Sequence, residues 1–170
     1  MAFRQLARDT ENSAVAWPDG YRAGSVAEDA AEEIGALLLR VGHPLHPECE
    51  SGTPAGATYY VTRLFDYHRA DRNYALALRS STIVREASTG CIVGVCLVGG
   101  GGSGGDHFSI YYIQVDPVHQ NRGLGTAMIC RALTVLAEAG VPRFHLWRKD
   151  DARAASLYDR LGFTPTGVVE

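Results

Sequence analysis

Residues 115–126 read Val-Asp-Pro-Val-His-Gln-Asn-Arg-Gly-Leu-Gly-Thr, and this segment decides how the fold is interpreted. The aromatic and β-branched residues of Phe108–Val115 predict a strand, which Pro117 ends because proline cannot donate a hydrogen bond to a sheet. Apolar residues at helical spacing then predict a helix over Leu124–Ala139, which Gly140 ends. The segment is therefore expected to be a tight turn between a strand and a helix, where glycine lets the backbone approach a ligand closely.

A turn of this kind can bind an anion, because the first amides of a helix lack partners and the helix dipole is positive there. Two known phosphate-binding motifs fail on spacing. The dinucleotide fingerprint requires glycine or alanine three residues after Gly125, where the chain has Met128, and the phosphate loop of nucleoside triphosphatases requires a lysine before Thr126. Spacing alone leaves two interpretations open: a phosphate site, or glycines that serve only a tight turn and close packing.

The predicted elements around the turn indicate an α/β fold with a mixed sheet. A strand at Phe144–Trp147 completes a strand–helix–strand unit of the size of one right-handed crossover. Upstream, Ser81–Arg85 and Cys91–Val98 flank a turn at residues 88–90, the pattern of a β-hairpin. The glycine-rich stretch Gly99–Gly105 predicts a flexible loop between two strands.

The rest of the chain gives weaker patterns. These predict a short strand at Gly20–Gly24, a helix from Ser25 to about Val41 with Ser25 and Glu28 at capping-box spacing, a loop over Gly42–Gly56, and helices at Tyr59–Arg69 and Ala152–Leu161. Residues 1–19 are expected to form a loosely ordered extension. The 170 residues match one domain in length, so a single domain over 1–170 is predicted.

Composition excludes several classes of protein. A formal net charge of -3 offers no basic surface for a nucleic-acid backbone. The longest apolar stretch, Cys91–Val98, is far shorter than the roughly 20 residues of a transmembrane helix, and Met1–Gly20 lacks the apolar block of a secretory signal. We therefore expect a cytoplasmic protein without nucleic-acid or membrane partners, whose cysteines are reduced.

The turn carries a resemblance to a known family. Gln120–Gly125 resembles the Gln/Arg-x-x-Gly-x-Gly/Ala motif of the GNAT superfamily of N-acetyltransferases, and the preceding Val115-Asp116-Pro117 fits the same pattern. Asp151–Phe163 resembles that family's carboxy-terminal helix with its Leu-Gly-Phe ending. Together these segments cover about the last third of the chain. The resemblance implies a GNAT-like α/β fold: a mixed, mainly antiparallel central sheet flanked by helices, with a strand pair that splays at Asp116-Pro117.

The resemblance also implies acetyl-CoA as the acyl donor. Its pantetheine arm would pair with the backbone of Ile113 and Val115, and an amide there would stabilise the oxyanion. Tyr158 would protonate the departing thiolate, since a phenol of pKa roughly 10 faces a thiol of roughly 8.5. Asp151 stands where relatives usually have asparagine, and it is read either as a cofactor ligand or as a helix cap. The pyrophosphate would lie on the backbone of Asn121, Arg122, Gly123, Leu124, Gly125 and Thr126.

No general base is singled out. Ser109, Tyr111, Ile113 and Val115 are expected to share one strand face without an acid among them, and the position of a fifth-strand acid in some relatives is Leu146. Glu86, His107 or a water relay remain the candidates.

No metal site is expected either. His43, His46 and Cys49 have a spacing that resembles metal ligands, but no fourth ligand is evident. The loop that contains them is interpreted instead as a lip of the acceptor pocket.

Two hypotheses of function follow. The first is an N-acetyltransferase that transfers acetyl from acetyl-CoA to a primary amine of a small molecule or peptide, by direct attack in a ternary complex. The alternative is a non-catalytic module that binds acetyl-CoA or CoA as a sensor or partner domain. The sequence leaves open the acceptor, a longer acyl group and transfer to oxygen; a homodimer is consistent with the resemblance.

Overall fold

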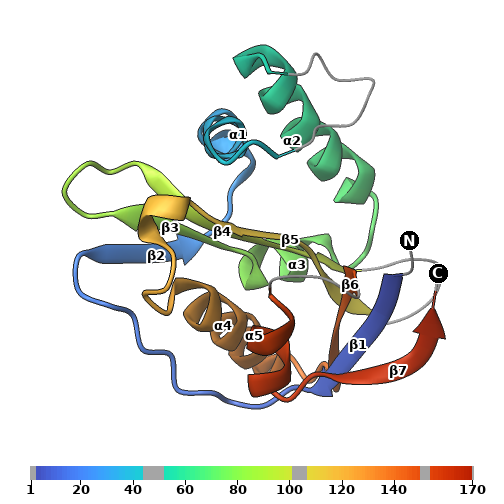
Figure 1. Ribbon diagram of the computed structural model, residues 1–170. Coiled ribbons are helices and arrows are strands. Elements are labelled where there is room, and N and C mark those ends of the chain that lie inside the picture. The colour runs from blue at the N-terminus through green and yellow to red at the C-terminus, as the bar shows by residue number, and fades with distance from the viewer. Residues whose placement is uncertain (1–2, 44–51, 101–106, 150–153, 170) are drawn as a thin grey trace.

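A computed structural model describes residues 3–43, 52–100, 107–149 and 154–169 of the chain (Figure 1). The strands are β1 (Phe3–Asp9), β2 (Tyr21–Ser25), β3 (Thr82–Glu86), β4 (Ile92–Gly100), β5 (Phe108–Val115), β6 (Arg143–Lys149) and β7 (Thr164–Val169). The helices are α1 (Ala31–Arg40), α2 (Pro54–Arg69), α3 (Tyr74–Ser80), α4 (Leu124–Glu138) and α5 (Ala155–Arg160), with short 3-10 helices η1 (Glu28–Ala30) and η2 (Pro117–His119).

The seven strands form one sheet in the order β2-β3-β4-β5-β6-β1-β7. All neighbouring strands are antiparallel except β5 and β6, which are parallel and joined through α4. Figure 1 shows α1 and α2 on one face of the sheet and α4 and α5 on the other. The predicted α/β class with a mixed, mainly antiparallel sheet is confirmed.

The sheet separates two apolar clusters, and β4 contributes to both because it is buried along its whole length. One cluster packs under α4, where Met128, Ile129 and Leu133 are almost fully buried against Val84. The other packs under α1 and α2 and includes Leu37, Leu38 and Val61. Alternate residues of a strand point to opposite faces, so a central strand covered by helices on both sides is apolar throughout.

Several predicted elements are confirmed. The hairpin appears as β3 and β4, β5 has the predicted bounds, and Gly140 follows α4 with φ of 76°. Gly99 and Gly100 belong to β4 instead of the predicted loop, while residues 101–106 lie outside the described ranges. The last helix is described from Ala155.

The expectation of a loosely ordered extension at residues 1–19 is wrong for Phe3–Asp9. This segment forms β1, which pairs with β6 on one side and β7 on the other. Leu6 and Ala7 are 1% and 0% exposed. The pattern was too short and too charged to predict a strand, because only these two residues enter the core. Strand β7 and helix α3 were not predicted either.

The predicted capping box is also wrong. Ser25 is the last residue of β2, and its hydroxyl accepts a hydrogen bond from Arg131 Nη2 at 2.8 Å. Glu28 instead pairs with Arg69 of α2 at 2.8 Å. The chain therefore enters α1 through η1, without a side-chain cap at either start.

None of the helices in the described part of the chain combines the length and apolar character that crossing a membrane requires.

Candidate active site

Strands β5 and β6 separate soon after they start. They pair only at Phe108 with Phe144, Ser109 with His145, and Ile110 with Leu146. Beyond these pairs, β5 continues beside β4 as far as Val115, and β6 continues beside β1. In the described part of the chain no strand therefore pairs with the edge of β5 from residue 111 to 115, where the Val115 carbonyl accepts from the side-chain amides of Gln114 and Gln120. The predicted splay is confirmed, but it begins five residues before Asp116-Pro117.

A β-bulge lies where the strands part. Tyr112 pairs with Leu97 and Ile110 with Val98, so Tyr111 is an extra residue in β5. A bulge shifts the alternation of side chains and bends the strand. Tyr111 and Tyr112 consequently both face α2, with Tyr111 4.4 Å from His68 between ring centroids.

The same bulge corrects a prediction. Ile113 and Val115 pack against the apolar cluster under α4, on the opposite face from Tyr111. The expectation that Ser109, Tyr111, Ile113 and Val115 share one face is therefore wrong, because strict alternation does not hold across the extra residue.

The turn after β5 has the backbone geometry that its glycines predict. Asn121 and Gly123 have φ of 59° and 85°, in the left-handed region that favours glycine. Gly123 is the N-cap residue of α4, and its carbonyl accepts from the Ala127 amide at 3.0 Å. A Cβ added at Gly123 would meet no atom within 4 Å, so the space above the turn is open. The first amides of α4, at residues 124–126, thus face this space without helical partners.

An open groove with a volume of about 840 Å³ runs along this turn. It brings together the end of β5, the turn, the first turn of α4 and one side of α5. The residues predicted to bind the pantetheine arm and the pyrophosphate, except Arg122, and the predicted acid Tyr158 are among those that line it. The lining residues are Ile113, Gln114, Val115, His119, Gln120, Asn121, Gly123, Leu124, Gly125, Thr126, Ala154, Ser156, Leu157, Tyr158 and Arg160.

The side chain of Arg122 points to β2 instead of the groove. Its guanidinium donates to the Tyr21 hydroxyl at 3.1 Å, and that hydroxyl lies 2.8 Å from His119 Nδ1. His119 Nε2 in turn lies 4.0 Å from a carboxylate oxygen of Glu86, which also accepts from Thr89. This network ties the turn to the sheet. It also holds the carboxylate of Glu86, one of the predicted candidates for the base, beside the turn.

Tyr158 is the buried tyrosine of the groove. Its side chain is 7% exposed, and its ring centroid is 6.2 Å from that of Phe163 in an edge-to-face arrangement. Burial raises the pKa of Tyr158 to about 12, and the nearby Cys96 thiol acts in the same direction. Within the described ranges its hydroxyl has no hydrogen-bond partner. Tyr158 is therefore a protonated hydroxyl at neutral pH that is free to bond a ligand in the groove.

Three residues that the sequence singled out lie outside the described ranges. Asp151 lies outside the described residues. The same holds for His46 and Cys49, and within the described ranges no three His, Cys, Asp or Glu side chains gather in a way that could hold a metal ion.

The other candidate base, His107, belongs to a histidine pair that the sequence did not reveal. Its ring stacks on that of His145, with centroids 3.9 Å apart and planes at 25°. Burial, followed by the neighbouring His107 and Arg143, lowers the pKa of His145 to about 4. No local pattern could have indicated this pair, because it depends on which strands are neighbours.

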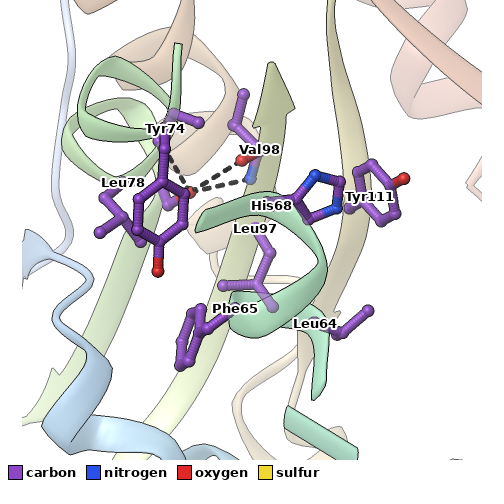
Figure 2. Close-up of a pocket in the computed structure, with 10 residues that line it drawn as sticks. Leu64, Phe65, His68, Tyr74, Leu78, Leu97, Val98 and Tyr111 are labelled. Atoms are coloured by element: carbon purple, nitrogen blue, oxygen red, sulfur yellow. Dashed lines mark hydrogen bonds between the residues drawn. The ribbon is translucent and has the colours of Figure 1, made fainter. Parts of the chain in front are cut away.

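A second cavity, between α2, α3 and β4, is too small for an acceptor. Its volume is about 20 Å³, space for roughly one water molecule. Figure 2 shows the ring of His68 against that of Tyr111 at one side of this cavity, with Leu64, Phe65 and Leu97 below. It is therefore a packing gap, whereas the groove beside α4 has the volume for a ligand of cofactor size.

The end of β5 beyond the splay, the turn with unpartnered helix amides and the buried Tyr158 thus border one groove. A sequence model of the Acetyltransferase (GNAT) family matches residues 45–163. The chain belongs to this family.

Known proteins and structures agree with this assignment. The chain is 50% identical over 159 residues to a mycothiol acetyltransferase of Beutenbergia cavernae, a match that spans 89% of this chain and 48% of the relative. It superposes on a GCN5-related N-acetyltransferase from Sphaerobacter thermophilus with a TM-score of 0.70 at 22% identity, covering 96% of this chain and 48% of the other. A tandem GNAT protein of clavulanic acid biosynthesis gives a TM-score of 0.68 at 19% identity, covering 96% and 50%. The chain thus spans about half the length of these proteins.

Proposed function

We propose that this protein transfers an acetyl group from acetyl-CoA to a primary amine, by direct attack of the amine in a ternary complex. The observation that supports this most strongly is the single groove that joins the free edge of β5, the glycine turn and Tyr158. The residues fit the cofactor, because the turn combines unpartnered amides with a glycine whose surroundings are open.

The turn would hold the pyrophosphate of acetyl-CoA. The amides of Leu124, Gly125 and Thr126 would donate to its oxygens, and the positive end of the α4 dipole would favour its charge. Asn121 and Gly123 would shape the backbone through their left-handed conformations. A side chain at Gly123 would enter the same space, so the site depends on a glycine at this position.

The free edge of β5 would hold the pantetheine arm. Backbone groups of Ile113 and Val115 lie on the strand that β6 has left, and an extended arm can pair with such an edge as an added strand. A backbone amide near the bulge at Tyr111 would donate to the carbonyl oxygen as negative charge develops on it.

Tyr158 would act as the general acid. Acetyl-CoA supplies the thioester, whose carbonyl carbon the amine attacks. Tyr158 remains protonated at neutral pH because burial raises its pKa to about 12, so its hydroxyl is available to donate to the sulfur as the C–S bond breaks.

The class of amine acceptor is proposed from the name of a similar protein. A relative with 50% identity is named a mycothiol acetyltransferase, so amines related to mycothiol are the first acceptors to screen. The alternative of a sensor or partner module that binds acetyl-CoA without turnover predicts binding but no acetylated product.

The test is acetyl transfer measured by mass spectrometry with acetyl-CoA and a panel of amines: mycothiol-related amines, 2-phenylethylamine and glycinamide. Mass detection is needed because thiol-bearing acceptors interfere with assays of released CoA. An acetylated amine formed in proportion to enzyme supports the proposal. Saturable binding of acetyl-CoA without product from any amine supports the module instead.

Three further expectations belong to this proposal. We propose that residues 1–170 form one acetyltransferase domain, that the protein acts in the cytoplasm, where acetyl-CoA is consumed, and that it forms a homodimer. Sedimentation of the purified protein tests the last of these.

A further inference from the structure

One positive charge in the groove beside α4 has no counter-ion. Arg160, the last residue of α5, is exposed and lines this groove. Among the described residues that line the groove none is Asp or Glu, although the chain has 19 acidic residues. The Arg160 guanidinium makes no hydrogen bond or ion pair with any described residue. An unpaired arginine in a groove without carboxylates favours an anionic ligand.

The carboxylates that share a surface with Arg160 are paired with other arginines. Arg160 also lines a neighbouring groove of about 630 Å³, to which Asp9 and Glu11 contribute. Arg143 Nε lies 3.5 Å from a carboxylate oxygen of Asp9, and Glu11 forms an ion pair with Arg8. Arg160 is therefore left available for a ligand.

Arg160 lies at the end of the groove that is away from β5. A side-chain carbon of Leu157, one helical turn before Arg160, is 3.5 Å from the place that a Cβ would take at Gly125, so α5 packs beside the first turn of α4. The neighbouring groove contains Cys130, which lies further along α4, and no described residue of β5. The groove beside α4 therefore extends from β5, past the first amides of α4, to Arg160.

Acetyl-CoA carries a second anionic group beyond its pyrophosphate. The pyrophosphate joins the pantetheine arm to an adenosine whose ribose bears a 3′-phosphate. With the pyrophosphate on the amides of α4 and the arm along β5, the adenosine leaves toward the end of the groove where Arg160 lies. A phosphate monoester has a charge of about −1.5 to −2 at neutral pH, and the planar guanidinium can donate to two of its oxygens at once.

A hydroxyl lies beside this guanidinium. Ser156 precedes Arg160 by four residues, so the two side chains share one face of α5, with their Cβ atoms about 5–6 Å apart. Ser156 is exposed and lines the same groove, and its hydroxyl has no partner among the described residues. A hydroxyl and a guanidinium at this spacing can donate to separate oxygens of one phosphate.

We propose that Arg160, assisted by Ser156, binds the 3′-phosphate of the donor, so that the protein selects acetyl-CoA over donors that lack this group. This inference rests on the proposed function, specifically on the binding of acetyl-CoA in the groove. Arg160 takes no part in the acetyl transfer itself. It therefore determines the affinity for the donor and leaves kcat unchanged.

The test is a calorimetric comparison of acetyl-CoA with acetyl-dephospho-CoA, which lacks only the 3′-phosphate, at constant ionic strength. Wild type should bind acetyl-CoA about tenfold more tightly, because hydrogen bonds to charged groups are strong. Arg160→Gln should lose this preference by weakening the binding of acetyl-CoA alone, and Ser156→Ala should lose a smaller part of it. Arg143→Gln is the matched control, since it removes the same charge from the neighbouring groove and should keep the preference.

Steady-state kinetics give a second readout. In Arg160→Gln the KM for acetyl-CoA should rise about tenfold, with kcat within twofold of wild type. Equal binding of the two donors by wild type, or a preference retained in Arg160→Gln, would overturn the assignment of Arg160 alone. A wild type that binds neither donor would overturn the proposed function, and this inference with it. Selective binding without an acetylated amine would contradict the proposed transfer and still support the role of Arg160.

Discussion

Two regions of the molecule, the turn side after β5 and the histidine side made of Gln5, His107, His145 and Thr166, are built in different ways. The turn side is one contiguous segment, residues 115–126, whose chemistry lies in backbone amides and in the left-handed φ of Asn121 and Gly123. The histidine side takes Gln5, His107, His145 and Thr166 from four places in the chain, joined only because β5, β6, β1 and β7 are neighbours in the sheet. A site made of backbone groups from one segment can therefore be predicted from that segment alone. A site made of side chains from several strands can be predicted only when the order of the strands is known.

The two regions also differ in which interactions cost free energy. The turn has left-handed backbone at Gly123, for which positive φ costs little, and at Asn121, whose short polar side chain tolerates this region. On the histidine side, burial and like charge oppose ionisation of His145, and the Gln5 amide is satisfied only by partners from other strands. The turn is therefore sensitive to single residues within it, and the histidine side to changes in any of four strands.

The largest expected effect tests the chemistry of the groove. Tyr158→Phe removes the proposed acid while keeping the ring against Phe163, so kcat should fall by about 100-fold or more with the Kd for acetyl-CoA unchanged. Steady-state kinetics and calorimetry measure the two quantities. Tyr74→Phe is the matched control: Tyr74 donates to Glu28 away from the groove, and its loss should leave kcat intact. An undiminished kcat in Tyr158→Phe would show that another group protonates the sulfur.

A smaller effect, on stability, tests whether β1 is integral to the histidine side. Leu6 is 1% exposed in the cluster under α4, so Leu6→Ala should lower the free energy of unfolding by about 2–5 kcal/mol. Urea denaturation followed by circular dichroism measures the change. Phe3→Ala, at a 39% exposed position of the same strand, should cost much less. Equal and small losses in both variants would mean that β1 contributes little to the core.

The smallest expected effect concerns how far His145 lowers the free energy of unfolding as the pH falls. Burial lowers its folded pKa from 6.5 to about 4, so between these pH values the unfolded chain binds a proton that the folded chain does not. This contribution makes stability fall as pH drops from about 6.5 to about 4. His145→Phe removes it, so the variant should lose less stability than wild type between pH 7 and pH 5 in urea denaturation. Parallel pH dependences in the two proteins would contradict a neutral, half-buried His145.

The elements and residues that the sequence predicted all lie in segments with a local pattern of their own. The strand, turn and helix from Phe108 to Leu136 carry their own periodicity and stop signals, and Tyr158 lies in a segment with a recognisable ending. Strand β1 has only two core residues, and the bulge at Tyr111 arises from the register with β4, so neither has a local signature. For the same reason His107 could be proposed as a base, but its stacking on His145 and its contact with Gln5 could not.

The central claim is that the turn before α4 binds acetyl-CoA, and calorimetric titration tests it most directly. Wild type, Gly123→Glu and Gly140→Glu should be compared, with ATP and NAD as ligand controls. Gly123 and Gly140 flank the two ends of α4, both have positive φ, and a Cβ at either meets nothing within 4 Å, so the strain of substitution is matched. The account predicts saturable acetyl-CoA binding by wild type and Gly140→Glu and its loss in folded Gly123→Glu. Equal binding by the two variants, or none by folded wild type, would contradict it.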